Sequence, residues 1–278
     1  MARRAHQFPW KSAGRVSEQM LSGDDVVRAT GWVFNNATGD SLTLAEFVAT
    51  GDEEVPAYLE TFGARSEANQ DRALVEIGSG IGRMTCAFTR EFGSVIACDL
   101  DAGFLERCYE TVGRFGKVDR LRTLEVIDGR NLDLPTDSVD VAFSYITLQH
   151  CSRDDALHLA GEAIRVVRPG GTVMLNFRGP AGSDAFLVPA GRLVRSMYRM
   201  PTLGGWLSRQ RSFTRLAWQV SRVHPDDVIT TLGEQLRDVQ VWTNPVAHVA
   251  VSGRQAEVDQ RSFEGINRHH WWLIATVT

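Results

Sequence analysis

An alternating glycine pattern, G-x-G-x-G, occurs in the segment ALVEIGSGIGR at residues 73–83. The apolar run at 73–77 has the character of a buried parallel strand, and residues 84–92 have helical composition. A strand, a glycine turn and a helix N-terminus form a ligand site at the carboxyl edge of a parallel sheet, because glycine lets a ligand approach the backbone closely. The predicted binding residues of this segment are Glu76, Gly78, Ser79, Gly80, Gly82 and Arg83.

Polar residues follow two further apolar runs. Asp99 and Leu100 come directly after the run at 94–98. An acid at the end of a second parallel strand can accept hydrogen bonds from both hydroxyls of a ribose, so these two residues are predicted to bind a ligand. A third run, at 121–127, is closed by Asp128, Gly129 and Arg130.

The elements that must position these residues alternate between strands and helices. A fourth apolar run at 139–144 ends in Ser144, which Tyr145 follows. A helix is predicted at 154–167, and the sequence RPGG then turns the chain into a fifth strand at 172–177, because proline ends a helix and glycine permits the turn. This alternation predicts an α/β fold with a mainly parallel sheet.

Five motif positions, in order over residues 73–177, resemble those of class I methyltransferases that use S-adenosylmethionine. The resemblance rests on the glycine segment with the acid before its first glycine, Asp99 after the second run, Asp128 after the third run, the fourth strand with the sequence SVDVAFS, and the RPGG turn. Dinucleotide dehydrogenases prefer G-x-G-x-x-G, so the spacing argues against a nicotinamide oxidoreductase. The resemblance implies a Rossmann-like sheet of seven mainly parallel strands with helices on both faces. The last strand, at 269–277, is expected to be antiparallel and to pair near 239–242.

The resemblance also implies S-adenosyl-L-methionine as the cofactor. In the family, an acid at the position of Asp99 holds the ribose, and the segment beginning at Asp128 holds the adenine. Ser144 and Tyr145 are then expected beside the cofactor, with Tyr145 against the methionine moiety or the acceptor. Metal-dependent small-molecule O-methyltransferases carry acids at the end of the fourth strand, whereas this chain has Ser144, so we expect no catalytic metal. A metal bound through the acceptor is left open.

His150 is the candidate catalytic residue, because it lies just past the fourth strand, on the loop that faces the transferred methyl group in this family. Histidine titrates near neutral pH and can remove the proton of a hydroxyl acceptor, although an orienting role is the alternative. We therefore expect O-methylation of a small molecule such as a sugar or a secondary metabolite. N-methylation of an amine, which needs no strong base, and cofactor binding without catalysis are the alternatives.

Residues 178–224 contain eight arginines, no lysine and one acid, Asp184, so the segment carries +7 and the remainder of the chain −11. Helical spacing predicts two basic amphipathic helices joined by a turn at 201–205, with arginines on one face of each: Arg192, Arg195 and Arg199, then Arg211 and Arg215. Three interpretations are open. The segment forms a structural face paired with acids of the core, binds an anionic acceptor, or contacts an anionic membrane or lipid-linked acceptor.

Residues 1–70 match no motif, and helices are expected at 41–48 and 53–62, with Pro56 near the start of the second. The resemblance implies that this segment is a lid over the cofactor and acceptor, with simple packing on the core as the alternative. The expected organisation is a lid at 1–70 and a methyltransferase core at 71–278, with a basic helical cap insertion at about 179–224.

Composition agrees with a globular enzyme. The chain has 278 residues, of which 43% are hydrophobic, enough for a large core. No apolar stretch approaches the length of a membrane span, and no apolar signal core follows the basic N-terminus, so a cytoplasmic protein is expected. The four cysteines lack C-x-x-C spacing, which favours reduced thiols. No nucleic-acid module is recognisable, so the expected partner is a small-molecule acceptor, and a homodimer is left open.

Overall fold

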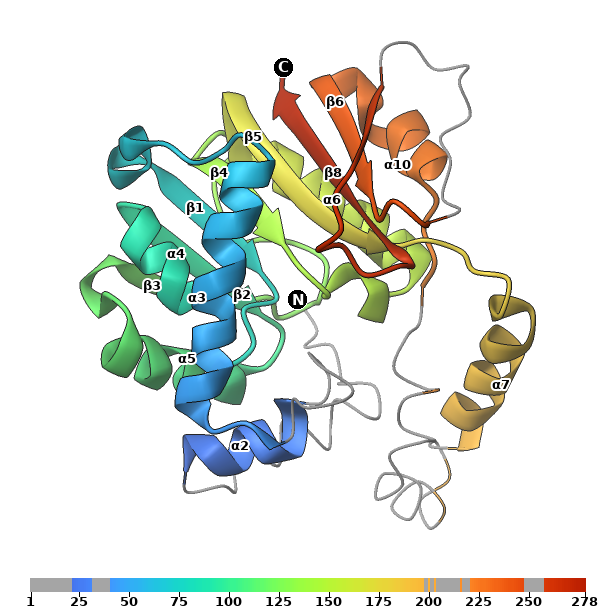
Figure 1. The fold of residues 1–278 in the computed structure, drawn as a ribbon, viewed down its shortest axis with the longest axis horizontal. Helices are drawn as coiled ribbons and strands as arrows, with labels where there is room; N and C mark the ends of the chain where they lie inside the picture. The colour runs from blue at the N-terminus through green and yellow to red at the C-terminus, as the bar shows by residue number, and fades with distance from the viewer. Residues whose placement is uncertain are drawn as a thin grey trace.

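The structure is a computed structural model that describes residues 22–31, 41–197, 200, 203, 216, 221–247 and 258–278. Its centre is an eight-stranded sheet in the order β3-β2-β1-β4-β5-β8-β6-β7 (Figure 1). The strands are β1 Ala73–Ile77, β2 Ser94–Asp99, β3 Leu121–Glu125, β4 Val139–Ser144, β5 Val167–Arg178, β6 Leu236–Thr243, β7 Asp259–Ser262 and β8 His270–Val277. The main helices are α2 Gly23–Thr30, α3 Leu44–Thr61, α4 Thr85–Glu91, α5 Ala102–Phe115, α6 Arg153–Val166, α7 Asp184–Met197 and α10 Pro225–Leu232.

The strands β3, β2, β1, β4 and β5 run parallel, and β8 runs antiparallel to both β5 and β6. This confirms the Rossmann-like architecture and the antiparallel last strand. The strand order reverses beside β1, which pairs with β2 on one side and with β4 on the other. In open α/β sheets, the carboxyl ends of the strands at such a reversal form the ligand crevice, so the glycine turn after β1 stands where a ligand is expected.

Alternating residues of the buried strands pack on opposite faces of the sheet, because successive side chains of a strand point to opposite sides. Val75 and Ile77 of β1 belong to the core that includes α6 and α10. Leu74 belongs to a second core, built with α3, α4 and Trp272 of β8. Both faces of the sheet are therefore covered by helices, as Figure 1 shows.

The sheet formed by the described residues has eight strands instead of the seven expected. The additional strand, β7, pairs in parallel with β6 at the edge of the sheet. Its four residues, with the sequence DQRS, are all exposed. A strand without a buried face has no alternation of apolar and polar residues, so the sequence carried no signal for it.

The fifth strand begins at Val167, five residues earlier than expected, and the RPGG sequence lies within it. Val167 pairs with Val139, and the register shifts before the next pair, between Val141 and Thr172. The glycine residues therefore form an irregularity inside the strand, which is where glycine is often found in sheets.

The helix α3 is a single helix over 44–61, where two helices were expected, and Pro56 lies inside it. Proline in a helix interior costs about 3 kcal/mol. The helix nevertheless continues, because residues along its length, from Phe47 to Leu59, are buried against the core. A Cβ at Gly51 would lie 2.2 Å from the carbonyl oxygen of Arg83, so α3 packs directly on the backbone that leads into α4.

The helix α7 confirms the first of the two predicted basic helices, and in Figure 1 it lies apart from the layers of the sheet and its covering helices. The second basic helix, the turn at 201–205 and Arg199 lie outside the described residues. Among the helices that the structure describes, none is long and apolar enough to cross a membrane.

Candidate active site

The glycine turn is held against the end of β2 by backbone hydrogen bonds. The N–H groups of Gly78 and Ser79 both donate to the carbonyl oxygen of Cys98, at 2.7 and 3.0 Å. The N–H of Gly80 donates to Oδ2 of Asp99 at 2.9 Å. The turn and the acid that the sequence predicts for a ribose therefore lie side by side at the carboxyl edge of the sheet.

The three glycines of the turn all have positive φ but differ in their surroundings. A Cβ at Gly78 would lie 2.0 Å from Oγ1 of Thr147, and a Cβ at Gly82 would lie 3.2 Å from Sγ of Cys108. A Cβ at Gly80 would meet nothing within 4 Å. Gly80 is thus the member of the turn whose open side faces space that a ligand can use.

Asp99 accepts hydrogen bonds from two backbone N–H groups. That of Gly80 donates to its Oδ2, and that of Asp101 donates to its Oδ1 at 3.0 Å. A carboxylate only accepts hydrogen bonds, which is the chemistry that ribose hydroxyls require. Asp99 and Leu100 are half-buried. This arrangement fits a cofactor that presents two ribose hydroxyls to the end of β2.

Glu76 lies beneath the glycine turn and is 4% exposed. Oγ1 of Thr85, in the first turn of α4, donates to its Oε2 at 2.6 Å. Burial raises the pKa of Glu76 to about 7, although Thr85 and Arg83 act in the opposite direction. The carboxyl group is therefore partly protonated at neutral pH and supports the turn from inside the core.

Glu76 should make the stability of the protein depend on pH. Its pKa in the folded state, about 7, lies above the ordinary value of 4.5, so the folded state binds more protons in this range. The free energy of unfolding is then expected to fall by up to about 3 kcal/mol as pH rises from about 5 to about 8. Urea denaturation at several pH values measures this, and Glu76→Gln, which keeps an acceptor for Thr85, should flatten the slope. An equal slope in both proteins would contradict this assignment.

Arg83 connects the glycine turn to the N-terminal helix α3. Its side chain is 8% exposed, and Nη1 lies 3.1 Å from Oε2 of Glu54 and 3.3 Å from Oγ1 of Thr50. Its guanidinium lies 5.8 Å from the ring centroid of Tyr145. Arg83 is predicted to bind the cofactor, and in the structure it connects α3 to the glycine turn through these contacts.

Tyr145 belongs to an aromatic cluster beside the turn. Its ring stacks on Trp272 with a centroid distance of 5.4 Å and an interplanar angle of 7°. Tyr58 of α3 lies 5.5 Å from the same ring. Burial raises the pKa of Tyr145, so its hydroxyl stays protonated at neutral pH. Tyr145 thus forms a fixed wall at the end of β4, to which an N-terminal helix contributes.

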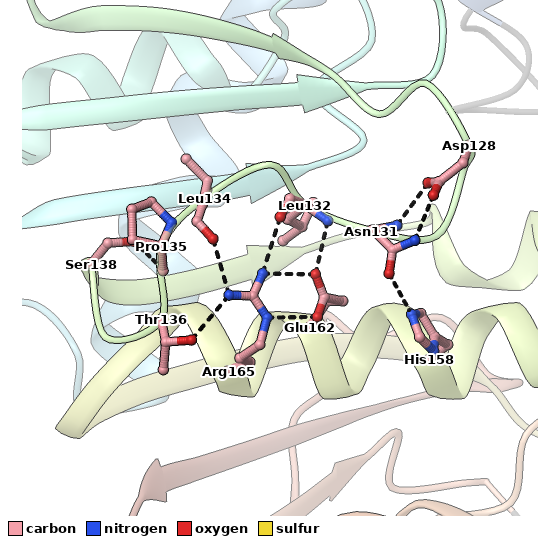
Figure 2. A network of polar contacts seen from close by, with 10 residues as sticks. All are labelled: Asp128, Asn131, Leu132, Leu134, Pro135, Thr136, Ser138, His158, Glu162 and Arg165. Carbon is pink, nitrogen blue, oxygen red and sulfur yellow. Dashed lines mark hydrogen bonds and ion pairs between the residues drawn. The ribbon is translucent and has the colours of Figure 1, made fainter. Parts of the chain in front are cut away.

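The loop after β3, which carries Asp128, Gly129 and Arg130, is fastened by α6 (Figure 2). Arg165 donates to the carbonyl oxygens of Leu132 and Leu134, each at 3.0 Å. Glu162 pairs with Arg165 at 2.6 Å and accepts the N–H of Leu132 at 2.9 Å. No role at the site was predicted from the sequence for Glu162 or Arg165. Their i, i+3 spacing on a helix indicates an ion pair, and this was the signal in the sequence that could have found them.

Asp128 shapes the start of this loop. The N–H groups of Arg130 and Asn131 both donate to its Oδ1 at 2.9 Å. These bonds and one from the Asn131 side chain outweigh burial and lower the pKa of Asp128, so it is charged at neutral pH. Arg130 is exposed and lies 3.3 Å from Oδ1 of Asp155. The structure therefore places this loop at the same sheet edge as Asp99, next to the end of β2.

The residues after β4 form a tight turn held by a neighbouring strand. Ser144 is fully buried, and its hydroxyl donates to the carbonyl oxygen of Ile77 at 3.0 Å. Ile146 has a φ of +54°, a backbone conformation that costs a β-branched residue about 1–3 kcal/mol and that recurs at functional sites. Its N–H donates to Oδ1 of Asn176 on β5, at 3.4 Å.

Asn176 also fixes His270, a residue that sequence reasoning did not connect with the site. The amide Nδ2 of Asn176 donates to the carbonyl oxygen of Trp271 at 3.3 Å, so its Oδ1 is the acceptor for Nδ1 of His270 at 3.0 Å. Burial, with Arg178 and His150 nearby, lowers the pKa of His270 to about 3. His270 is therefore neutral and donates through Nδ1.

His150 lies in the short helical turn Leu148–His150 and is half-buried. Its Nε2 lies 3.4 Å from Nε2 of Gln149, and its charge influences His270. Gln149 is 5% exposed, and its Oε1 is buried without a hydrogen-bond partner among the described residues. The N–H of Ser221 donates to the carbonyl oxygen of Gln149 at 3.1 Å, so the end of the arginine-rich segment helps to hold this turn in place.

Among the described residues, no group of three or more histidine, cysteine, aspartate or glutamate residues could hold a metal ion. Burial raises the pKa of Cys86, Cys98 and Cys108, so these thiols are protonated at neutral pH.

Residues 75–175 match the family described as the methyltransferase domain. They form a class I, S-adenosylmethionine-dependent methyltransferase domain. The match runs from β1 into β5, so this methyltransferase domain includes the glycine turn, Asp99 and His150. S-adenosylmethionine is the cofactor of the family, and the open side of Gly80 and the carboxylate of Asp99 at the end of β2 fit it.

Two curated relatives match part of the chain. The biotin biosynthesis bifunctional protein BioHC of Cellvibrio japonicus is 32% identical over 116 residues, which are 41% of this chain and 21% of that protein. Phosphoethanolamine N-methyltransferase 1 of Triticum aestivum is 28% identical over 122 residues, which are 44% of this chain and 23% of that protein. The chain thus spans about a fifth of the length of the curated relatives that it matches.

Among solved structures, the YcgJ protein of Bacillus subtilis resembles this chain with a TM-score of 0.51 and 18% sequence identity. The likeness covers 80% of this chain and 97% of that one. At this level of identity the likeness concerns the fold alone.

Proposed function

We propose that the protein transfers a methyl group from S-adenosylmethionine to a hydroxyl group of a small molecule. The observation that carries the hydroxyl assignment is the position of His150, half-buried at the end of β4, on the sheet edge that also carries Gly80 and Asp99. In this proposal the glycine turn and Asp99 hold the cofactor, and the loop of Asp128 to Arg130 borders its adenine.

The cofactor supplies a methyl group on a sulfonium, which is already activated. The protein must then align the acceptor, exclude water and remove the hydroxyl proton. His150 accepts that proton through its imidazole. The turn that holds His150 is kept in place by Asn176 at one end and by Ser221 at the other. Tyr145, stacked on Trp272, forms a wall beside the acceptor.

Two further parts of the proposal concern the segments around the core. Residues 1–70 act as a lid, supported by the contacts of α3 with Arg83 and Tyr145. Residues of about 179–224 act as a cap over the acceptor within the core at 71–278. A lipid-linked acceptor is a secondary possibility for the cap, because α7 leaves Phe186 82% and Leu193 63% exposed.

N-methylation of an amine is the second candidate function. It is favoured by the similarity to a phosphoethanolamine N-methyltransferase over 44% of this chain. An amine acceptor has a free lone pair once it is neutral, so it depends less on a strong base than a hydroxyl does. The two candidates therefore differ in what they require of His150.

A screen of acceptors by mass spectrometry tests the proposed function. The wild-type protein, incubated with S-adenosylmethionine and pools of small hydroxyl or amine compounds, should add one methyl group to a member of a pool. Asp99→Ala is the matched control, because losing its charged hydrogen bonds should weaken cofactor binding by about 2–4 kcal/mol. Calorimetry with S-adenosylhomocysteine measures that loss. Unchanged affinity in a folded Asp99→Ala protein would contradict the cofactor site.

A further inference from the structure

Two buried arginines converge on one carboxylate beyond the end of β5. Nη2 of Arg178 lies 3.4 Å from Oδ1 of Asp184, and Nη2 of Arg222 lies 2.8 Å from the same oxygen. The side chains of Arg178, Arg222 and Asp184 are 7%, 13% and 11% exposed. The second carboxylate oxygen of Asp184 accepts the N–H of Ala181 at 2.8 Å.

This cluster has more positive than negative charge. Asp184 is the one acid in residues 178–224, so the segment itself has no second carboxylate to offer. Burial, followed by the proximity of Arg222, lowers the pKa of Arg178 to about 10. Burial and Arg222 also lower the pKa of Arg195 on α7. Because a buried charge is costly unless its donors are satisfied, the buried guanidinium of Arg178 favours an additional anion at this cluster.

Arg178 has donor capacity that the protein does not use. Its residue is 6% exposed, and its Nε is buried without a hydrogen-bond partner in the part of the chain that the structure describes. A guanidinium presents its N–H groups in a planar fork that matches a carboxylate or phosphate. Oδ1 of Asp184, which Arg178 shares with Arg222, cannot accept hydrogen bonds from all the N–H groups of the Arg178 guanidinium. An additional oxyanion could accept the remaining ones.

The cluster lies next to the turn that carries His150. Arg178 pairs with His270 in the β5–β8 register, and Arg178 and His150 both influence the charge of His270. Ser221, the neighbour of Arg222, donates through its N–H to Gln149 and through its hydroxyl to the carbonyl oxygen of Leu148 at 3.2 Å. An anion held here would therefore stand beside the proposed general base.

We propose that Arg178 and Arg222 bind an oxyanion, a phosphate or carboxylate group, that the methyl acceptor carries. The inference rests on the proposed function and narrows it to anionic small molecules. It also assigns the recognition role to two arginines at the ends of the basic segment. Arg192, on the exposed part of α7, has no such role.

Calorimetric titration with inorganic phosphate and, separately, with acetate tests the site without any methyl transfer. Wild-type protein should bind at least one of the two anions, and the stronger of them identifies the group. Arg222→Gln should weaken that binding about ten-fold or more, since a charged hydrogen bond is lost. Arg178→Lys, which keeps the charge but removes the Nε donor, should weaken it several-fold. Arg192→Gln is the matched control and should bind as the wild type does.

Asp184→Asn separates a binding site from a structural ion cluster. If the arginines bind an anion, removing the competing charge should tighten phosphate binding several-fold. Absence of binding by the wild type, or equal affinity in the Arg222→Gln and Arg192→Gln proteins, would overturn the proposal. Should Arg222→Gln fail to fold, as judged by circular dichroism, Arg222→Lys replaces it. Titration with S-adenosylhomocysteine is independent of this cluster, so its failure would refute the cofactor proposal and leave the anion site standing.

Discussion

A Gly80→Val variant is expected to lose binding of S-adenosylhomocysteine by about 100-fold or more while remaining folded. The added side chain would project into the space where no atom of the protein lies within 4 Å of the Cβ position, which is the space that the cofactor needs. The local clash with the cofactor would therefore cost several kcal/mol of binding free energy. Isothermal titration calorimetry measures the affinity, and circular dichroism checks the fold.

A matched control separates the clash from backbone strain. Valine at Gly80 must adopt a φ of +54°, which disfavours a β-branched residue and lowers stability by itself. Gly63, in the exposed turn after α3, has a φ of +69° and equally open surroundings. Gly63→Val should show a similar loss of thermal stability but wild-type affinity for S-adenosylhomocysteine. If Gly80→Val also bound with wild-type affinity, the glycine turn could not be the cofactor site.

The second large effect is expected at His150. If its imidazole removes the acceptor proton, His150→Ala should lower kcat by about 10²–10⁴-fold, the usual scale for losing general base catalysis. Affinity for S-adenosylhomocysteine should barely change, because the glycine turn and Asp99, which are proposed to hold the cofactor, lie in other loops. Steady-state kinetics with the acceptor found in the screen measure the loss, and calorimetry measures the cofactor affinity.

The control for His150→Ala is His158→Ala. His158 is an exposed histidine of α6 that contacts Oδ1 of Asn131 at 3.0 Å in the loop after β3. Its loss should leave turnover unchanged at saturating cofactor. Near-normal turnover by His150→Ala would remove the general base from the mechanism and would favour an amine acceptor. In that event the similarity to the N-methyltransferase becomes the better guide to the reaction.

Local sequence patterns were sufficient to predict the parallel half of the sheet. The bounds of β1 and β4 agree with the apolar runs at 73–77 and 139–144. A run of buried residues between glycine or proline signals has few alternative structures, and the carboxyl ends of parallel strands meet at one edge. For the same reason, the proximity of Gly80 and Asp99 could be predicted before any coordinate was known.

Elements stabilised by tertiary packing could not be predicted in this way. The sequence around Pro56 favours a break, but packing against the core keeps α3 continuous. The strand β7 has no buried face, so only its backbone pairing with β6 identifies it. In α3 a long-range contact outweighs the local preference of the sequence. In β7 a long-range contact forms the strand where the sequence has no local preference for one.

The spacing of the glycines in the sequence predicted a turn that binds a ligand. The different surroundings of Gly80 and Gly78 became visible in the tertiary structure, because Thr147, which fills the space at Gly78, comes from a different loop. The same holds for the acceptor side. Asn176 and His270 are 94 residues apart, and Arg222 reaches Asp184 across 38 residues. Local sequence patterns were sufficient to predict the methyltransferase architecture and the sheet edge at which the cofactor is proposed to bind. The partners of His150 and the pairing of the arginines were decided by the fold, because side chains distant in the sequence meet only when the sheet assembles.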